Sequence, residues 1–179
     1  FHRISADVHN RTRRTDKAVI ILNKKIKLKE LLIALAIPLA VGGVSAFITK
    51  DAMSGYQDLR QPPLSPPPWL FPAVWTVLYL VMGTASYLVC TSDASEPRRE
   101  KALTVYAVQL AANFCWPVIF FSMRLYLVSF IWLLVLWTLI LIAAVMFHYI
   151  RKSAGKLMLP YLAWVTFAGY LNLGVYLLN

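Results

Sequence analysis

Five long stretches of this chain contain no Asp, Glu, Lys or Arg, and they constrain its fold more than any other feature. They cover residues 31–49, 69–91, 102–121, 125–147 and 157–178. A helix rises about 1.5 Å per residue, so about 20 apolar residues cross a bilayer core of roughly 30 Å. All five stretches qualify, the first being the shortest. Apolar and polar residues do not alternate, and a backbone in lipid must satisfy its own hydrogen bonds. The sequence therefore predicts an all-α integral membrane protein, a five-transmembrane-helix bundle.

The composition supports a membrane protein and excludes several other classes. Hydrophobic residues make up 59% of the 179 residues and charged residues only 15%, whereas soluble domains carry about a quarter charged residues. This excludes a disordered chain, a collagen and a disulfide scaffold, and it argues against an ordinary cytosolic enzyme. The two cysteines, Cys90 and Cys115, match no metal-binding spacing, so no metal site is predicted.

The basic residues predict the orientation in the membrane. Fifteen of the 18 lie before the first stretch or in the second and fourth connections. The other three are Lys50, Arg60 and Arg124. By the positive-inside rule, the N-terminus is cytoplasmic and the C-terminus lies outside. Nucleic-acid binding by the basic tail stays open as the weaker alternative, and we predict no nucleic-acid partner.

Two segments differ from the spans. Residues 1–27 are polar and basic, and we expect a disordered or non-native N-terminal tail ahead of the transmembrane domain, residues 28–179. The first connection, residues 50–68, contains five prolines, which favour a stiff, extended backbone. Because long connections tend to be functional or disordered, we interpret it as a lid over a cavity, with a simple spacer as the alternative.

Polar and aromatic side chains recur at helical spacing in three spans. Gln109, Asn113 and Trp116 share one face of the third span, and the second and fifth spans carry comparable faces that include Tyr79 and Asn172. Amide groups at membrane depth need partners, so these faces should point into the bundle. For Gln109, an interhelical hydrogen bond and a ligand contact are equally compatible with the pattern. Deep tryptophans must also satisfy an indole N–H, which indicates a lined cavity.

Groups that carry chemistry are missing from the spans. No acidic residue lies inside any of them, which argues against a proton-coupled pump and an ion channel. No nucleophile with its base, phosphate-binding glycine loop or metal cluster is apparent, and no cofactor is predicted to be required.

Three motifs resemble one known family. The run QPPLSPPPWLFPAVWTVLYLVMG at 61–83, the run QLAANFCWPVIFF at 109–121 with Arg124, and the run PYLAWVTFAGYLN at 160–172 resemble, in order, the translocator protein family. Its bacterial members are called tryptophan-rich sensory proteins, and the mitochondrial ones were formerly called peripheral benzodiazepine receptors. The resemblance covers about residues 31–177.

The resemblance implies a pocket near the lid that binds porphyrins, haem, sterols or benzodiazepine-type compounds. The residues that match pocket-lining positions are Trp75, Trp116, Trp164, Ala168, Leu171 and Asn172, and those that match the pocket mouth are Trp69, Phe71 and Val74. Tyr79, Gln109 and Asn113 join this predicted ligand-binding set through their helical faces. The sterol-recognition pattern is incomplete, because no basic residue follows Tyr176. A bacterial-type member is therefore favoured.

Three functions are compatible with these observations. We favour a ligand-binding protein with a regulatory or stress-sensing role. The alternatives are light-dependent breakdown of protoporphyrin, which the resemblance assigns to Trp75 and Trp164, and transport of tetrapyrroles or lipids. No general acid–base group is available, so an enzymatic role rests on the resemblance alone.

The expected partners are membrane lipid, an apolar tetrapyrrole-like ligand and a second copy of the chain. One of Arg60 and Arg124 is a candidate to pair a porphyrin propionate, with a solvated or lipid-paired arginine as the alternative. The small residues Ala107 and Ala111 permit a homodimer through the third span, or close packing inside one bundle. The expected location is the bacterial cell membrane, with the mitochondrial outer membrane as the alternative.

Overall fold

A computed structural model describes residues 27–56 and 58–179. The prediction for the basic tail therefore lies outside the described residues, apart from Lys27.

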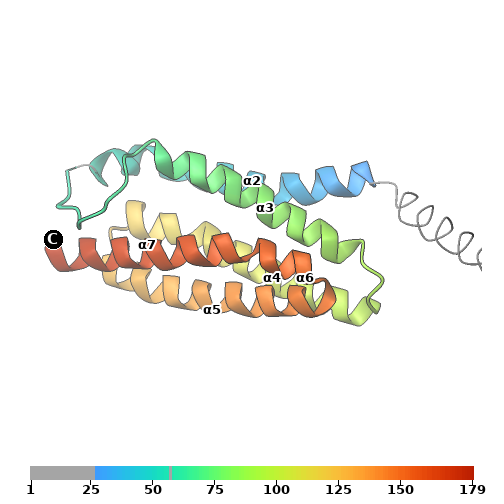
Figure 1. Cartoon of the computed structure of the whole chain (residues 1–179). Helices are drawn as coiled ribbons and strands as arrows, with labels where there is room; N and C mark the ends of the chain where they lie inside the picture. Colours follow the sequence, from blue (N-terminus) through green and yellow to red (C-terminus); the bar gives the residue numbers. More distant parts are fainter. Residues whose placement is uncertain (1–26, 57) are drawn as a thin grey trace, which may run out of the picture.

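The described part of the chain is helical and contains five segments long and apolar enough to cross a membrane. They are α2 (Leu28–Met53), α3 (Leu70–Cys90), α4 (Glu96–Pro117) with the π-helical turn η2 (Val118–Ser122), α5 (Tyr126–Ile150), and α6 (Lys152–Leu157) with α7 (Leu159–Leu178). A short 3₁₀ turn, η1 (Ser54–Tyr56), follows α2. This confirms the predicted all-α bundle (Figure 1).

The helix ends differ from the predicted spans where charged residues join the helices. The helix α4 begins at Glu96 and not near residue 102, because Pro97 occupies its first turn and an acidic residue is favourable at a helix N-terminus. The fifth span begins at Lys152, since the short helix α6 precedes α7. Both of these extra helical segments contain basic residues, so a search for uncharged runs could not include them.

Prolines mark the starts and ends of helices in most cases. Pro72 and Pro160 lie in the first turns of α3 and α7, where the missing N–H has no intrahelical partner in any case. Pro117 ends the regular part of α4 and is followed by the π turn. Pro38 lies within α2.

Small residues hold α2 against the bundle. Its buried residues, Pro38, Gly42, Ser45 and Thr49, form one narrow stripe at steps of four, three and four. Facing this stripe, Gly83 of α3 lies so close to α2 that a Cβ on it would be 2.6 Å from the carbonyl oxygen of Ala34. Most of the remaining α2 side chains are exposed, as expected for a lipid-facing helix.

The helices α3 and α7 have little direct contact, because each of them packs mainly against other helices. The helix α5 packs against α4 and α7, and α3 packs against α2 and α6. The ring centroids of Tyr106 on α4 and Phe147 on α5 are 5.6 Å apart, so these two helices run antiparallel with the start of α4 beside the end of α5. The arrangement leaves space between α3 and α7.

Candidate functional site

A lateral groove of about 550 Å³ lies between α3 and α7. Its volume is in the range of small-molecule sites, roughly 300–1,000 Å³. The lining is apolar and consists of Ala73, Val74, Val77 and Leu78 from α3, and Pro160, Ala163, Trp164 and Phe167 from α7. Four of these residues, Ala73, Val77, Pro160 and Ala163, are exposed. The groove therefore opens sideways onto the surface that faces lipid.

Among the lining residues of this groove, Trp164 is the one with a polar side-chain atom. Its indole Nε1 is buried and has no hydrogen-bond partner among the described residues. The Phe71 ring meets the indole edge-on at a centroid distance of 6.1 Å, and the Phe167 ring lies 5.6 Å away. A buried N–H without an acceptor is unfavourable, and most such groups in proteins are paired. An acceptor atom of a bound molecule would satisfy it.

A buried polar network joins α3, α4 and α7 deeper in the bundle. The Tyr79 hydroxyl donates to Asn113 Oδ1 at 2.9 Å, and Asn113 Nδ2 donates to the Tyr161 hydroxyl oxygen at 3.0 Å. The Tyr161 hydroxyl in turn donates to Gln109 Oε1 at 3.0 Å. The Trp75 ring packs beside both tyrosines, at centroid distances of 5.5 Å from Tyr79 and 6.1 Å from Tyr161. Gln109 and Asn113 thus make interhelical hydrogen bonds, and their contact with a ligand stays a prediction.

A second network centres on Asn172 and joins α4, α5 and α7. Trp116 Nε1 donates to Asn172 Oδ1 at 3.1 Å, and the Ser129 hydroxyl donates to the same oxygen at 2.9 Å. Asn172 Nδ2 donates to the backbone carbonyl of Tyr126 at 2.7 Å. Ser129 is fully buried and was not predicted. A lone serine in an apolar span was its only sequence signal.

The predicted ligand-binding residues therefore fall into separate groups. Val74 and Trp164 line the groove, and Phe71 touches Trp164. The members of the two networks lie behind it, in the bundle interior. Ala168 and Leu171 are buried on α7, whereas Trp69 is 68% exposed. The other groove residues were not predicted, since small apolar side chains carry no signal in a span that is apolar throughout.

The first connection is fixed to α7 and does not cover this groove. Pro62 is buried, and a Cβ on Gly174 would lie 2.6 Å from the Pro62 Cβ. The Tyr170 hydroxyl donates to the Pro63 carbonyl at 2.8 Å. The backbone N–H of Arg60 donates to Asn179 Oδ1, and Asn179 Nδ2 donates to the Arg60 carbonyl, both at 3.0 Å. The connection and the end of α7 lie together at one end of the bundle (Figure 1).

Aromatic rings pack beneath the connection, where the sequence predicted a pocket, and leave only a small cavity of about 10 Å³ there, which Tyr56, Phe120, Phe121 and Arg124 help to line. Tyr56 packs against Phe71, Phe120 and Phe121 at centroid distances of 6.4, 5.8 and 5.7 Å. Burial raises the pKa of the Tyr56 phenol above its ordinary value, so the group stays neutral at physiological pH. The groove of about 550 Å³ lies between α3 and α7 and not beneath the connection.

The two arginines proposed to pair a propionate lie outside the groove lining. Arg60 and Arg124 are both exposed. Arg124 has a positive φ of 55° in the turn before α5, a backbone conformation that is strained for residues other than glycine. Its guanidinium approaches Gly55, where a Cβ would lie 3.2 Å from Nη2. Propionate pairing stays a prediction, and so does the homodimer, although Ala107 and Ala111 are both exposed on α4.

The contact between Pro62 and Gly174 predicts how firmly the connection is held. Replacing Gly174 with leucine should displace the connection and speed tryptic cleavage after Arg60 about tenfold, because a loss of ~1.4 kcal/mol raises the open population by that factor. The matched control is Gly169→Leu on the same helix, whose Cβ would meet its nearest atom only at 4.0 Å. Equal cleavage rates for the two variants would contradict the contact. The rates are measured by mass spectrometry of the fragments.

Comparison with known proteins agrees with the resemblance seen in the motifs. The TspO/MBR family model matches residues 34–177. The tryptophan-rich protein TspO of Chlorobaculum tepidum is 36% identical over 158 residues, which is 88% of this chain and 99% of that protein. The tryptophan-rich sensory protein of Cereibacter sphaeroides is 36% identical over 69% of this chain and 76% of its own length. The translocator protein of Bos taurus is 36% identical over 65% and 70%, respectively.

Proposed function

The chain belongs to the TspO/MBR family of membrane proteins, and from this premise we propose that it binds a lipid-soluble, planar ligand of the tetrapyrrole class in the groove between α3 and α7. In this proposal the protein acts as a sensor or regulator that takes its ligand from the bilayer. The names of its relatives, tryptophan-rich sensory protein and translocator protein, are in keeping with such a role. The charge distribution of the sequence supports a cytoplasmic N-terminus.

The unpartnered indole N–H of Trp164 is the observation that carries this proposal. It is a buried hydrogen-bond donor on a residue that lines the groove, and the other lining residues are apolar, so an acceptor in the groove would reach it once the indole turns. A porphyrin is flat and largely apolar, and its carboxylates are strong acceptors. Its ring can stack on one of the Trp164 and Phe167 rings while one acceptor accepts a hydrogen bond from the indole N–H. Entry from the membrane requires no opening of the connection held on α7, because the groove faces lipid.

The test is a titration of the purified protein with protoporphyrin in the dark, in which binding is measured from the change in porphyrin absorbance. Trp164→Phe should weaken binding about tenfold, since it removes an aromatic donor with a hydrogen bond worth ~1 kcal/mol or more. Ala163→Leu should weaken it as well, because it fills the groove without altering Trp164. The matched control is Trp137→Phe, whose indole donates to Thr166 Oγ1 at 2.9 Å and does not line the groove. Wild-type affinity in both groove variants would exclude this site.

Light-dependent breakdown of the bound porphyrin is the second candidate function. The position of Trp164 supports it, because a ligand in the groove would lie against this indole. Illumination of the complex should then bleach the porphyrin spectrum, and Trp164→Phe should stop the bleaching even at saturating porphyrin. Bleaching at the same rate in the variant, or none in the wild type, would leave binding as the function.

A further inference from the structure

The corner between α5 and α6 gathers three basic residues into a short segment. The helix α5 ends at Ile150, and Arg151 adopts an extended backbone with φ −151° and ψ 115°. The helix α6 then folds back so closely that a Cβ on Gly155 would lie 2.5 Å from the His148 Cβ and 2.8 Å from its backbone nitrogen. Lys152 and Lys156, four residues apart, lie on one face of α6. Together with Arg151 they form what we term the basic corner.

The basic corner has no carboxylate to neutralise it in its own helices. The sequence contains no Asp or Glu after Glu100, so α5, α6 and α7 carry none. All three basic side chains are exposed, and none takes part in an ion pair between described residues. The adjacent His148 is exposed as well. Within the residues that the structure describes, the corner is therefore a concentration of positive charge without a paired carboxylate.

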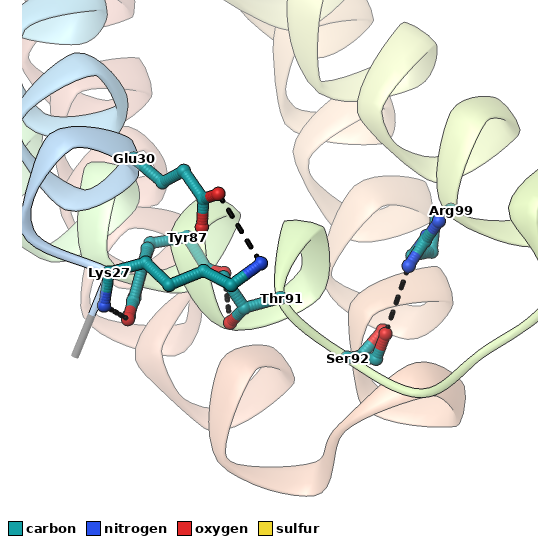
Figure 2. Close-up of polar contacts among 6 residues, drawn as sticks. All are labelled: Lys27, Glu30, Tyr87, Thr91, Ser92 and Arg99. Atoms are coloured by element: carbon teal, nitrogen blue, oxygen red, sulfur yellow. Dashed lines mark hydrogen bonds and ion pairs between the residues drawn. The ribbon is translucent and has the colours of Figure 1, made fainter. Parts of the chain in front are cut away.

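The basic residues at the starts of α2 and α4, at the same end of the bundle, differ in this respect. Figure 2 shows Lys27 Nζ paired with Glu30 at 3.4 Å and Arg99 Nη1 donating to the Ser92 carbonyl at 3.0 Å. The carboxylates of Glu96 and Glu100 lie among the basic residues at the start of α4. Charges on the α2–α3–α4 side are thus interleaved or hydrogen-bonded within the protein.

Apolar and aromatic surface flanks the basic corner on both sides. Tyr149, at the end of α5, is 86% exposed, and Leu159, at the start of α7, is 54% exposed. Tyr149 lies at the end of the fourth span, where tyrosine favours the headgroup level of a bilayer, and Leu159 begins α7 within the fifth span. A cation cluster at this level beside apolar surface suits a molecule with an anionic head and an apolar tail, and it suits a free anion less well.

We infer that the basic corner binds the phosphate headgroup of anionic membrane lipids. Arg151 offers a planar fork of N–H donors that matches phosphate oxygens, and the two lysines add point charges. The acyl chains would run along the exposed apolar surface beside Leu159. Basic residues at the membrane surface attract anionic lipids. The inference does not depend on which ligand occupies the groove between α3 and α7.

The test measures lipid selectivity of the full chain reconstituted in phosphatidylcholine bilayers. Spin-labelled phosphatidylglycerol should associate at least about threefold more strongly than spin-labelled phosphatidylcholine, as judged by the motionally restricted spectral component. The triple variant R151Q/K152Q/K156Q should lower this ratio to about one. The single variant K152Q should give an intermediate ratio, which keeps the test valid if the triple variant misfolds. A wild-type ratio near one, or a wild-type ratio in the variants, overturns the inference.

Two controls separate this site from general charge effects and from soluble anions. The variant K29Q/R98Q/K101Q removes the same number of charges from the same end of the bundle and should keep the wild-type ratio. An equal loss of selectivity in this control variant would show that selectivity depends on the total charge and not on the basic corner. Inorganic phosphate added to the wild-type bilayers should not displace spin-labelled phosphatidylglycerol at constant ionic strength. Displacement would assign the corner to a soluble anion and overturn the lipid assignment.

Discussion

Replacing Gly83 with leucine is expected to force α2 away from α3 and to lower the stability of the bundle more than any other single change proposed above. A Cβ at this position would lie 2.6 Å from the Ala34 carbonyl oxygen and 2.8 Å from the Leu35 Cα. Both are backbone atoms, so no side-chain rotation can relieve the clash. Overpacking of this kind costs about 1–3 kcal/mol in soluble cores, and we expect the upper end of that range.

The measurement is the free energy of unfolding in mixed micelles, with thermal unfolding as a second probe. The matched control is Gly43→Leu on α2, where a Cβ would meet nothing within 4 Å. Both substitutions raise helix propensity by about 0.8 kcal/mol, so only the clash distinguishes them. Gly43→Leu should be neutral or slightly stabilising. If the two variants unfold at the same midpoint, α2 and α3 are not in the close contact described.

Asn172→Leu should have the second-largest effect, because it removes the hub of the network between α4, α5 and α7. The Trp116 indole N–H would lose its acceptor. The Ser129 hydroxyl would keep the Tyr126 carbonyl, 2.8 Å away, as its acceptor, and that carbonyl would lose the Asn172 amide as a donor. Orphaned buried groups cost about 1–3 kcal/mol each in soluble proteins, whereas membrane hydrogen bonds average about 0.6 kcal/mol. We expect a total loss of about 2–3 kcal/mol in the free energy of unfolding.

The outcome also distinguishes a structural role of Asn172 from a ligand contact. As a structural residue, it should affect unfolding strongly and the affinity for protoporphyrin less than Trp164→Phe does. The double variant W116F/N172L should recover part of the lost stability, since the unpartnered indole donor is then gone. Wild-type stability combined with a large loss of affinity would instead make Asn172 a ligand contact.

The spans could be predicted from the sequence because membrane burial imposes a length and an apolar composition on each helix. The inward direction of the polar faces followed from the same physics: Gln109, Asn113 and Asn172 are buried, as amide groups at membrane depth must be. The helix ends were less predictable. The basic residues of α6 and of the start of α4 lie at the membrane boundary, where helices no longer need to be apolar.

The sequence by itself thus determined how many apolar segments there are, which polar residues of the third and fifth segments face inward and which connections carry the positive charge. Only the tertiary structure decided how these segments converge. The groove exists because α3 packs on α2 and α6 while α7 packs on α5. The types of residue that line the groove do not predict that α3 and α7 are separated. The aromatic packing beneath the first connection was also a tertiary outcome, because Tyr56, Phe71 and Phe120 are distant in sequence and meet only when the bundle forms. Local periodicity fixes which side of a helix is buried, but the volume left between two helices depends on every other contact that positions them.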